Sequence, residues 1–321
     1  MSQLPIPAAL VADLEQLDQI IADRVQSRSA VIQVAGHYLL ASGDKRIRGA
    51  LTLLAAQLGT YDLNTVIHSA AAIELIHAAL LVHDDLVDET EQRRGIYAVH
   101  TRWDDNVALM VGDYLLALAS AEMALAPDPR IIGFFSRGVM TICEGQLAPV
   151  MALTPLNTAL EQYQYQISSK TAALFEAACK AGMVCGGGSP EQIEAMGRFG
   201  YELGMAFQIV DDVLDFTTGF ASVGKPVGYK VRNGIITLPL IYAADVEQSS
   251  EFGAIIDAQP PTEEQVAWVI QEVQRLGGTE RALEDARKHI ERAHTHLADF
   301  PDGPTRQALK DIADYVISRT Q

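Results

Sequence analysis

The sequence predicts an all-α protein, a bundle of about a dozen helices around a central cavity. Apolar residues recur at three- and four-residue steps through most of the chain, which is the spacing of one helix face. No segment shows the alternation typical of strands, and neither a glycine-rich dinucleotide loop nor a Walker motif occurs. No Pro/Ser-rich linker or low-complexity segment divides the 321 residues, so we expect a single domain over residues 1–321.

Each predicted helix follows from this spacing and from the residues that interrupt it. Pro5 precedes the first helix, and Asn64 is the expected N-cap of a long helix that carries an acidic cluster. The predicted helical runs start near Ala8, then cover Ser29 to Leu40, Gly49 to Leu58, the stretch after Asn64, Trp103 to Leu125, Ile131 to Val150, Ala159 to Met183, Pro190 to Asp215, Leu238 to Ala244, Glu263 to Leu276, Arg281 to Phe300 and Thr305 to Arg319.

Composition excludes some classes of partner. The formal net charge is −17 and no basic stripe occurs, so we expect no nucleic-acid partner. Cys143, Cys179 and Cys185 have no metal-site spacing and are expected to be small buried hydrophobes in a reducing cytosol. No signal peptide is recognisable, and two acids interrupt the apolar run from Val107 to Ala126. We therefore expect a cytoplasmic protein with no transmembrane segment.

A first acidic cluster, DDLVDET, carries a functional signal. A helix turns about 100° per residue, so Asp84 and Asp88 share a face one turn apart, with Asp85 beside them. Like charges at this spacing repel, and a bound cation is the simplest reason for the arrangement. Carboxylate-rich, all-oxygen ligation suits Mg²⁺, which also binds substrate phosphates. Arg93 and Arg94 follow, and their planar guanidinium groups suit phosphate oxygens.

A second acidic cluster, DDVLDFT, lies far downstream. Its acids are Asp211, Asp212 and Asp215. They lie within an apolar run, where carboxylates must be paired or metal-bound. Facing helices of a bundle commonly build metal sites, so two opposed clusters would bind two or three Mg²⁺ ions and neutralise a diphosphate between them.

Several short motifs occur in a fixed order along the chain. They are GDKRIRG, then ELIHAALLVHDD with RRG behind it, Gly112-Asp113, Glu144-Gly145-Gln146, Lys170-Thr171, FQIVDDVLDF, GKPVG and TLPL. Together they resemble the trans-isoprenyl diphosphate synthases, or polyprenyl synthetases, over nearly the whole chain. The resemblance implies the isoprenoid synthase type of fold. It also implies a head-to-tail condensation of an allylic diphosphate with isopentenyl diphosphate to an all-trans polyprenyl diphosphate.

The resemblance also implies roles for individual residues. Two Mg²⁺ ions would be ligated by Asp84 and Asp88, supported by Asp85, and a third by Asp211, with Asp212 and Asp215 alongside. The allylic diphosphate would be held by Arg93, Lys170 and Lys225. The diphosphate of isopentenyl diphosphate would be held by Lys45, Arg48, His77 and Arg94. Thr171 and Gln208 would line the reacting centre.

The product tail would lie along the first acidic helix, away from the metals. Leu80 and Ala79, four and five residues before Asp84, lie about 6–7.5 Å along that helix. In the family, aromatic residues at these positions stop the product early. A small Ala79 and a moderate Leu80 therefore imply a C20 or longer product, grown on geranyl, farnesyl or geranylgeranyl diphosphate. Candidates for the floor of the tail channel are Leu116, Ser120 and Met123.

The chain departs from the family pattern at three places. Lys230 stands where an aspartate usually follows GKPVG, Tyr97 stands where proline is common, and Ala148-Pro149 follows the EGQ triplet. These departures keep open a non-catalytic partner subunit of a heteromeric prenyl synthase. A class I terpene cyclase, which ionises the same kind of diphosphate, is a second alternative. Family members are usually homodimers, and we expect the same here.

Overall fold

The computed structural model describes residues 4–40, 46–93, 95–217, 227–247, 251–257 and 260–319, and the predicted all-α class is confirmed within them. The helices are α1 Ala8–Arg24, α2 Ala30–Leu40, α3 Ile47–Gln57, α4 Leu63–Val87, α5 Val99–Arg102, α6 Asp105–Met123, α7 Arg130–Gln146, α8 Leu156–Ile167, the π-helical turn η1 Ser168–Ala172, α9 Ala173–Cys185, α10 Pro190–Leu214, α11 Tyr229–Arg232, α12 Leu238–Glu247, α13 Glu251–Asp257, α14 Glu263–Arg275, α15 Gly278–His296 and α16 Pro304–Ser318. A short antiparallel hairpin, β1 Gln92–Arg93 and β2 Ile96–Tyr97, follows α4.

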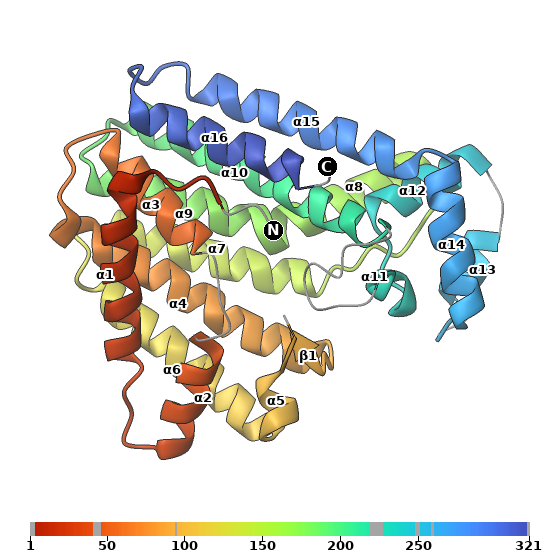
Figure 1. The fold of residues 1–321 in the computed structure, drawn as a ribbon, viewed down its shortest axis with the longest axis horizontal. Helices are drawn as coiled ribbons and strands as arrows, with labels where there is room; N and C mark the ends of the chain where they lie inside the picture. The colour runs from red at the N-terminus through yellow and green to blue at the C-terminus, as the bar shows by residue number, and fades with distance from the viewer. Residues whose placement is uncertain are drawn as a thin grey trace.

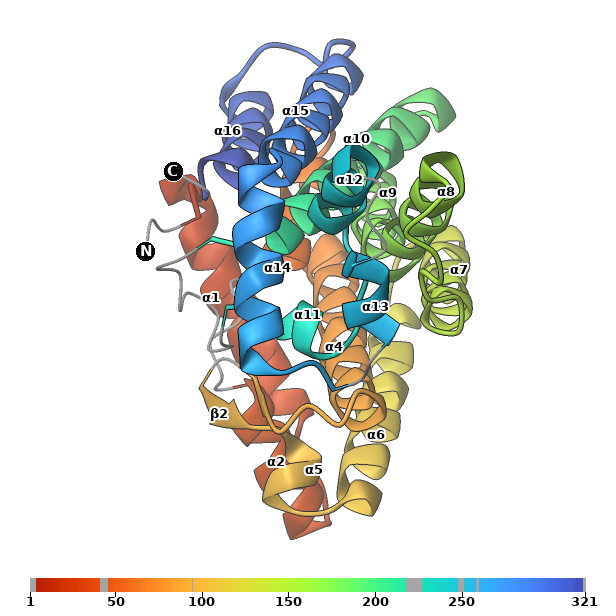
Figure 2. The same ribbon diagram turned by 90° about the vertical axis from the view of Figure 1, so that its right-hand side faces the viewer.

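The long helices lie in layers (Figures 1 and 2). α15 and α16 cover α10 on one side, α9 packs against α10, α3 and α4, and α6 lies along the far side of α4. α9 therefore lies between the two helices that carry the acidic clusters. Both of those helices end on the side of the bundle where the hairpin and α11 lie (Figure 1). Large apolar side chains from α3, α9 and α10 fill the core, among them Leu51, Phe175 and Phe199.

Two helices, α4 and α6, are long and apolar enough to cross a membrane by length and composition alone. The test concerns length and composition only, and the expected absence of a transmembrane segment stays a prediction. In the most apolar window of α4, 72% of the residues are buried inside the protein, as in the core helix of a bundle. The corresponding share for α6 is only 33%, and Leu109 and Met110 on this helix are exposed.

Local sequence signals were least accurate at element ends and in short elements. The N-cap of α4 is Asp62, not Asn64, because the Asp62 side chain accepts a hydrogen bond from the Asn64 N–H. The run predicted from Ala159 to Met183 is interrupted by η1. The hairpin and the short helices α5, α11 and α13 were not predicted, since elements this short show no recognisable period. The three thiols were expected to be buried, but only Cys179 is, since Cys143 is exposed and Cys185 is half-buried.

Candidate active site

The first acidic cluster lies at the carboxyl end of α4. Asp84 belongs to its last turn, and the N–H of Asp88 donates to the Asp84 carbonyl at 2.8 Å. The negative end of the helix dipole disfavours each carboxylate here by about 0.3–1 kcal/mol. Burial raises the pKa of Asp84, and Lys170 opposes that shift. The Lys170 Nζ atom lies 4.0 Å from Asp84 Oδ2 and 3.9 Å from Asp88 Oδ2, so these two carboxylates face a cation.

Asp85 points elsewhere and holds Arg93. The Arg93 Nε atom donates to Asp85 Oδ1 at 2.8 Å and to Oδ2 at 2.9 Å, and its terminal nitrogen lies 2.7 Å from Oδ1. Burial alone would lower the pKa of Arg93, but the hydrogen bond and charge of Asp85, together with the charges of Asp84 and Tyr229, raise it. Arg93 lies in β1, and Gly95 adopts a φ of +79° in the turn to β2, a conformation that favours glycine. Asp85 therefore orients an arginine beside the cluster.

The π turn η1 connects the two acidic clusters. Such turns add one residue to a helix and occur frequently at functional sites. Lys170 in this turn faces the carboxylates of α4, whereas its neighbour Thr171 donates to Gln208 Oε1 at 2.8 Å. Gln208 in turn donates through Nε2 to Asp212 Oδ1 at 2.9 Å. A continuous series of contacts thus runs from α4 to α10.

Two glycines let neighbouring helices approach the π turn closely. A Cβ at Gly145 in α7 would lie 2.4 Å from the Cβ of Ser169, and a Cβ at Gly204 in α10 would lie 2.6 Å from the backbone of η1. The same approach brings Gln146 to the first cluster, where its Nε2 atom donates to Asp88 Oδ1 at 3.2 Å. Helix packing therefore positions Lys170 and Gln146 on one acidic cluster.

Asp212 is the most enclosed acid of the second cluster, at 2% exposure. Its Oδ2 atom accepts from the Tyr163 hydroxyl at 2.6 Å, and its Oδ1 atom accepts from Gln208 and, at 2.5 Å, from Lys230 Nζ. The same ammonium lies 3.0 Å from Asp211 Oδ2. Both oxygens of Asp212 are therefore engaged by protein donors.

α11 supplies two further donors to this cluster through its backbone. The backbone N–H groups of Tyr229 and Lys230 donate to Asp215 Oδ1 at 3.1 Å and to Asp215 Oδ2 at 3.0 Å. Burial alone would lower the pKa of Lys230, but the charges of Asp211 and Asp212 outweigh burial and raise it, so the side chain is an ammonium ion. The Tyr229 hydroxyl also lies 3.0 Å from Thr90 Oγ1, which joins α11 to the loop after the first cluster.

The two clusters differ in their fit to a metal ion. Asp84 and Asp88 offer partly exposed carboxylates, and the Lys170 ammonium lies 3.9–4.0 Å from them. Mg²⁺ needs only one or two carboxylates when water and substrate phosphates complete its shell. The oxygens of Asp212 and Asp215 instead accept hydrogen bonds from protein donors. Within the described residues, no group of three or more His, Cys, Asp or Glu forms a ready metal site. The first cluster fits Mg²⁺, and the second does not fit it in this arrangement.

Two of the residues predicted for the second diphosphate are described: Arg48 lies at the start of α3 and His77 lies on α4. Arg48 is 9% exposed and its guanidinium carbon lies 4.7 Å from the centre of the Phe175 ring. Beneath it, the Gly49 N–H donates to the buried Glu74 carboxylate at 2.6 Å. His77 is half-buried, seven residues before Asp84 on the same helix. Lys45, Arg94 and Lys225 lie outside the described residues.

The predicted chain-length residues differ in their surroundings. Leu80 is half-buried and lies on the helix face of His77 and Asp84, one turn before the acid. Ala79 is fully buried in the packing of α4. Ser120, a candidate floor residue on α6, is exposed, whereas Leu116 and Met123 pack partly buried against the core.

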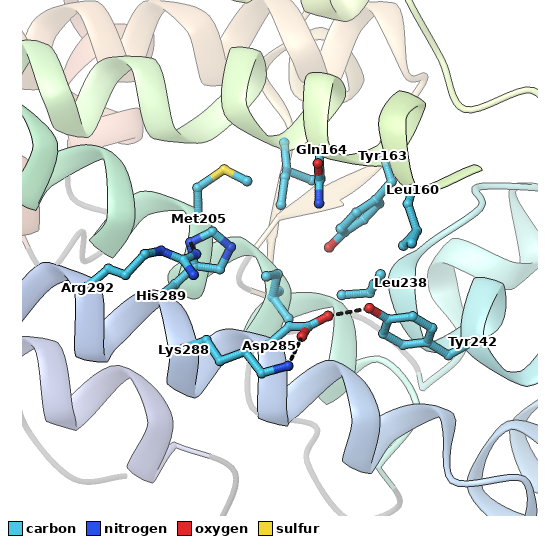
Figure 3. A pocket seen from close by; sticks show the side chains of 12 residues that line it. Leu160, Tyr163, Gln164, Met205, Leu238, Tyr242, Asp285, Lys288, His289 and Arg292 are labelled. Carbon is cyan, nitrogen blue, oxygen red and sulfur yellow. Dashed lines mark hydrogen bonds and ion pairs between the residues drawn. The ribbon is translucent and has the colours of Figure 1, made fainter. Parts of the chain in front are cut away.

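Tyr163, which holds Asp212, was not predicted from the sequence. A single tyrosine on an amphipathic helix gives no sequence signal, because its partner lies 49 residues away on another helix. Tyr163 also lines a cavity of about 150 Å³ between α8, α10, α12 and α15 (Figure 3). Among the polar groups at this cavity, Asp285 pairs with Tyr242 and Lys288. Tyr163 therefore connects the second cluster to the lining of this cavity.

Comparison with protein families gives one clear assignment. The family model described as polyprenyl synthetase matches residues 29–273. The short chain isoprenyl diphosphate synthase of Methanothermobacter thermautotrophicus is 36% identical over 290 residues, 89% of each chain. Heptaprenyl diphosphate synthase component 2 of Bacillus subtilis is 32% identical over 307 residues, 96% of this chain and 88% of that protein.

The fold leads to the same group of proteins. The crystal structure of a polyprenyl synthase from Caulobacter crescentus, complexed with calcium and isoprenyl diphosphate, superposes with a TM-score of 0.93 at 33% identity, covering 99% of this chain and 98% of that one. Similarity extends over the whole length in sequence and in structure. The chain therefore belongs to the polyprenyl synthetase family and is a trans-polyprenyl diphosphate synthase, a transferase of prenyl groups.

Proposed function

We propose that the protein condenses an allylic diphosphate head-to-tail with isopentenyl diphosphate, in a magnesium-dependent reaction, to an all-trans product of C20 or longer. The observation that carries this proposal is the series of contacts from Asp88 through Lys170, Thr171 and Gln208 to Asp212. It links two acidic clusters through one ammonium group. An anionic substrate needs such local cations in a chain whose net charge is −17.

The residues of the first cluster would act on the allylic diphosphate. Asp84 and Asp88 would hold Mg²⁺, which when bound supplies Lewis-acid neutralisation of the departing diphosphate. Lys170 and Arg93 would bind the same diphosphate and stabilise the charge that develops as the allylic C–O bond breaks and its electron pair leaves with the diphosphate.

The second substrate would supply the electrons for the new bond. Arg48 and His77, with Lys45 and Arg94, would hold the diphosphate of isopentenyl diphosphate so that its alkene lies against the allylic carbon. The alkene electrons form the carbon–carbon bond, and a proton leaves to the released diphosphate. No protein nucleophile is required for this sequence of steps.

Product length would depend on the face of α4 that precedes Asp84. Leu80 lies on that face and is smaller than an aromatic residue, which supports a path for a C20 or longer tail. The relatives carry names of both short and long products. The preferred primer, which would be geranyl, farnesyl or geranylgeranyl diphosphate, would therefore depend on the residues of this chain.

A primer series tests the proposal. Purified protein with Mg²⁺ and labelled isopentenyl diphosphate is incubated separately with dimethylallyl, geranyl, farnesyl and geranylgeranyl diphosphate, and the dephosphorylated products are sized. We expect a ladder that ends at one length of C20 or more. A ladder ending at C15 would contradict the length, and absence of incorporation from folded, Mg²⁺-supplied protein would contradict the reaction.

A second candidate function follows from one relative's name. The Bacillus subtilis protein is a heptaprenyl diphosphate synthase "component 2", a name that implies a further component. This chain would then act as one subunit of a heteromeric synthase. Incorporation by the purified chain alone contradicts this candidate, whereas activity that requires addition of a soluble extract from the source cells supports it.

We also propose a cytoplasmic homodimer. α6 exposes Leu109 and Met110 on a helix whose apolar window is largely unburied within one chain, and a second copy would cover them. The exposed Cys143 thiol suits a reducing compartment. Light scattering after size exclusion should give the mass of two chains, and Leu109→Asp with Met110→Asp should give one. Cell fractionation tests the compartment.

A further inference from the structure

The second acidic cluster already contains a cation, the side chain of Lys230. Its Nζ atom lies 3.0 Å from Asp211 Oδ2 and 2.5 Å from Asp212 Oδ1, and the side chain is 19% exposed. An ammonium so enclosed remains only because carboxylates surround it. Lys230 thus occupies the position between the acids that a metal ion would need.

Both oxygens of Asp212 and both oxygens of Asp215 are engaged by protein donors. Asp212 accepts from Tyr163 and Gln208, and Asp215 accepts from two backbone N–H groups of α11. Uncharged donors of this kind stabilise the carboxylates by hydrogen bonding, but they leave the negative charges in place. The first cluster differs, because the Lys170 ammonium lies 3.9–4.0 Å from the oxygens of Asp84 and Asp88.

The net charge of the second cluster depends on the residue at position 230. Asp211, Asp212 and Asp215 carry three negative charges, and Lys230 leaves two of them uncompensated. With an aspartate at position 230, the residue typical of the resembled family, the same volume would hold four negative charges. A divalent ion in the second cluster is therefore far more strongly favoured with an aspartate at position 230 than with a lysine.

We propose that the Lys230 ammonium replaces the third divalent cation of this active site, so that the enzyme binds two metal ions per chain. The inference rests on the proposed function, because it concerns the metal count of the same site. Lys230 acts here as a built-in counter-ion to the second cluster, and Tyr163 and Gln208 hold the carboxylate that binds it.

Metal stoichiometry tests this inference without an activity assay. Mn²⁺ is titrated into the full-length protein with saturating S-thiolo farnesyl diphosphate, whose bridging sulfur resists ionisation, and free Mn²⁺ is counted by electron paramagnetic resonance. We expect two Mn²⁺ ions per chain for the natural protein and for Lys230→Arg, which keeps the charge. We expect three for Lys230→Asp. Lys288→Met, which removes an exposed lysine paired with Asp285, is the matched control and should bind two.

Each outcome decides the matter. Three ions in the natural protein, or two in Lys230→Asp that circular dichroism shows to be folded, overturn the inference. If Lys230→Asp does not fold, the natural protein and Lys230→Arg still decide, because three ions in either overturn it and two in both support it. A protein that binds two ions but adds no isoprene unit to any primer refutes the proposed function and leaves the metal count intact. A protein that makes polyprenyl products and binds three ions refutes only the role of Lys230.

Discussion

At the scale of single residues, the account depends most on Lys170. It is the ammonium that faces both carboxylates of the first cluster, and its neighbour Thr171 begins the contacts to the second. No other described lysine is recorded in an ion pair with Asp84 or Asp88. The role proposed for Lys170 is to stabilise charge on the departing diphosphate.

Replacement of Lys170 by Met should lower kcat/KM by about 10²–10³-fold, the loss typical when one positioned electrostatic contact is removed. The lysine Lys180, on α9, is the matched control, because it pairs with Glu176 and Glu194 away from both clusters. Steady-state kinetics with farnesyl diphosphate should show Lys180→Met near the natural rate. An equal loss of kcat/KM in Lys170→Met and Lys180→Met would contradict a role at the diphosphate, because Lys180 lies away from both clusters and could act only through the fold.

Substitutions of Leu80 by a larger and by a smaller residue should have different effects on the length of the longest product. Leu80→Phe should shorten the longest product by filling the face of α4 before Asp84, and Leu80→Ala should leave it unchanged or lengthen it. Chromatographic sizing of the dephosphorylated products measures both. Ala79→Phe, at a fully buried position, should instead lower stability by about 1–3 kcal/mol through overpacking. Unchanged product length in Leu80→Phe would exclude this face as the tail path.

The sequence correctly placed the two acidic clusters at α4 and α10, although Asp88 and Asp215 are the residues that cap these helices rather than part of them, and it did not show how the acids are held. Asp84 and Asp88 share a face because helix geometry requires it, and this needs no tertiary information. The donors to Asp212 come from three separate elements, and no local pattern predicts Tyr163 or the orientation of Lys230. The roles assigned to individual site residues stay predictions until substitution tests them.

At the scale of elements, the π turn is the feature that positions the site. A run predicted as one helix from Ala159 to Met183 contains it, and neither composition nor periodicity reveals a single inserted residue. Gly145 and Gly204 show where neighbouring helices approach the turn, but a lone glycine in a helical pattern has many explanations.

Gly145→Ala should displace the π turn, because its Cβ would lie 2.4 Å from the Ser169 Cβ atom. We expect a loss of about 1–3 kcal/mol in the free energy of unfolding, from overpacking. The kcat of the folded variant should also fall, because displacement of the π turn would move Lys170 away from the first cluster. Gly133→Ala on the same helix has no neighbour closer than 4.0 Å and should be neutral or stabilising by up to about 1 kcal/mol.

Urea unfolding and kcat measured on both variants check this prediction. If Gly145→Ala is destabilised while its kcat matches the natural value, the position of the π turn does not control catalysis. A destabilised Gly133→Ala would show that α7 as a whole, rather than its contact with η1, is sensitive to substitution.

At the scale of the whole molecule, the layers bring together segments that are far apart in the sequence. α4 and α10 carry the clusters, α9 and η1 lie between them, and α11 closes the site from the end of α10. The all-α class followed from periodicity over long helices. The single domain over residues 1–321 stays a prediction, because it concerns whether the whole chain folds as one cooperative unit. The homodimer stays a prediction as well, because it concerns contacts between two chains.

Ligand binding at this site should stabilise the entire fold. Mg²⁺ together with S-thiolo farnesyl diphosphate at about 100 times its Kd should add about 2.7 kcal/mol, measured as a raised Tm that chelation reverses. The variant Asp84→Asn with Asp88→Asn should lose this increase. The exposed Asp299→Asn is the control and should keep it. An unchanged increase in the double variant would place the metal elsewhere.

The most direct test of prenyl transfer counts two products of one reaction. Purified protein is mixed with Mg²⁺, farnesyl diphosphate and labelled isopentenyl diphosphate, and released diphosphate is compared with label in the prenyl product. The account predicts one diphosphate released per isoprene unit added, and neither product without Mg²⁺. Diphosphate release without incorporation of label would contradict it, because the site would then ionise its substrate as a terpene cyclase does, without joining two.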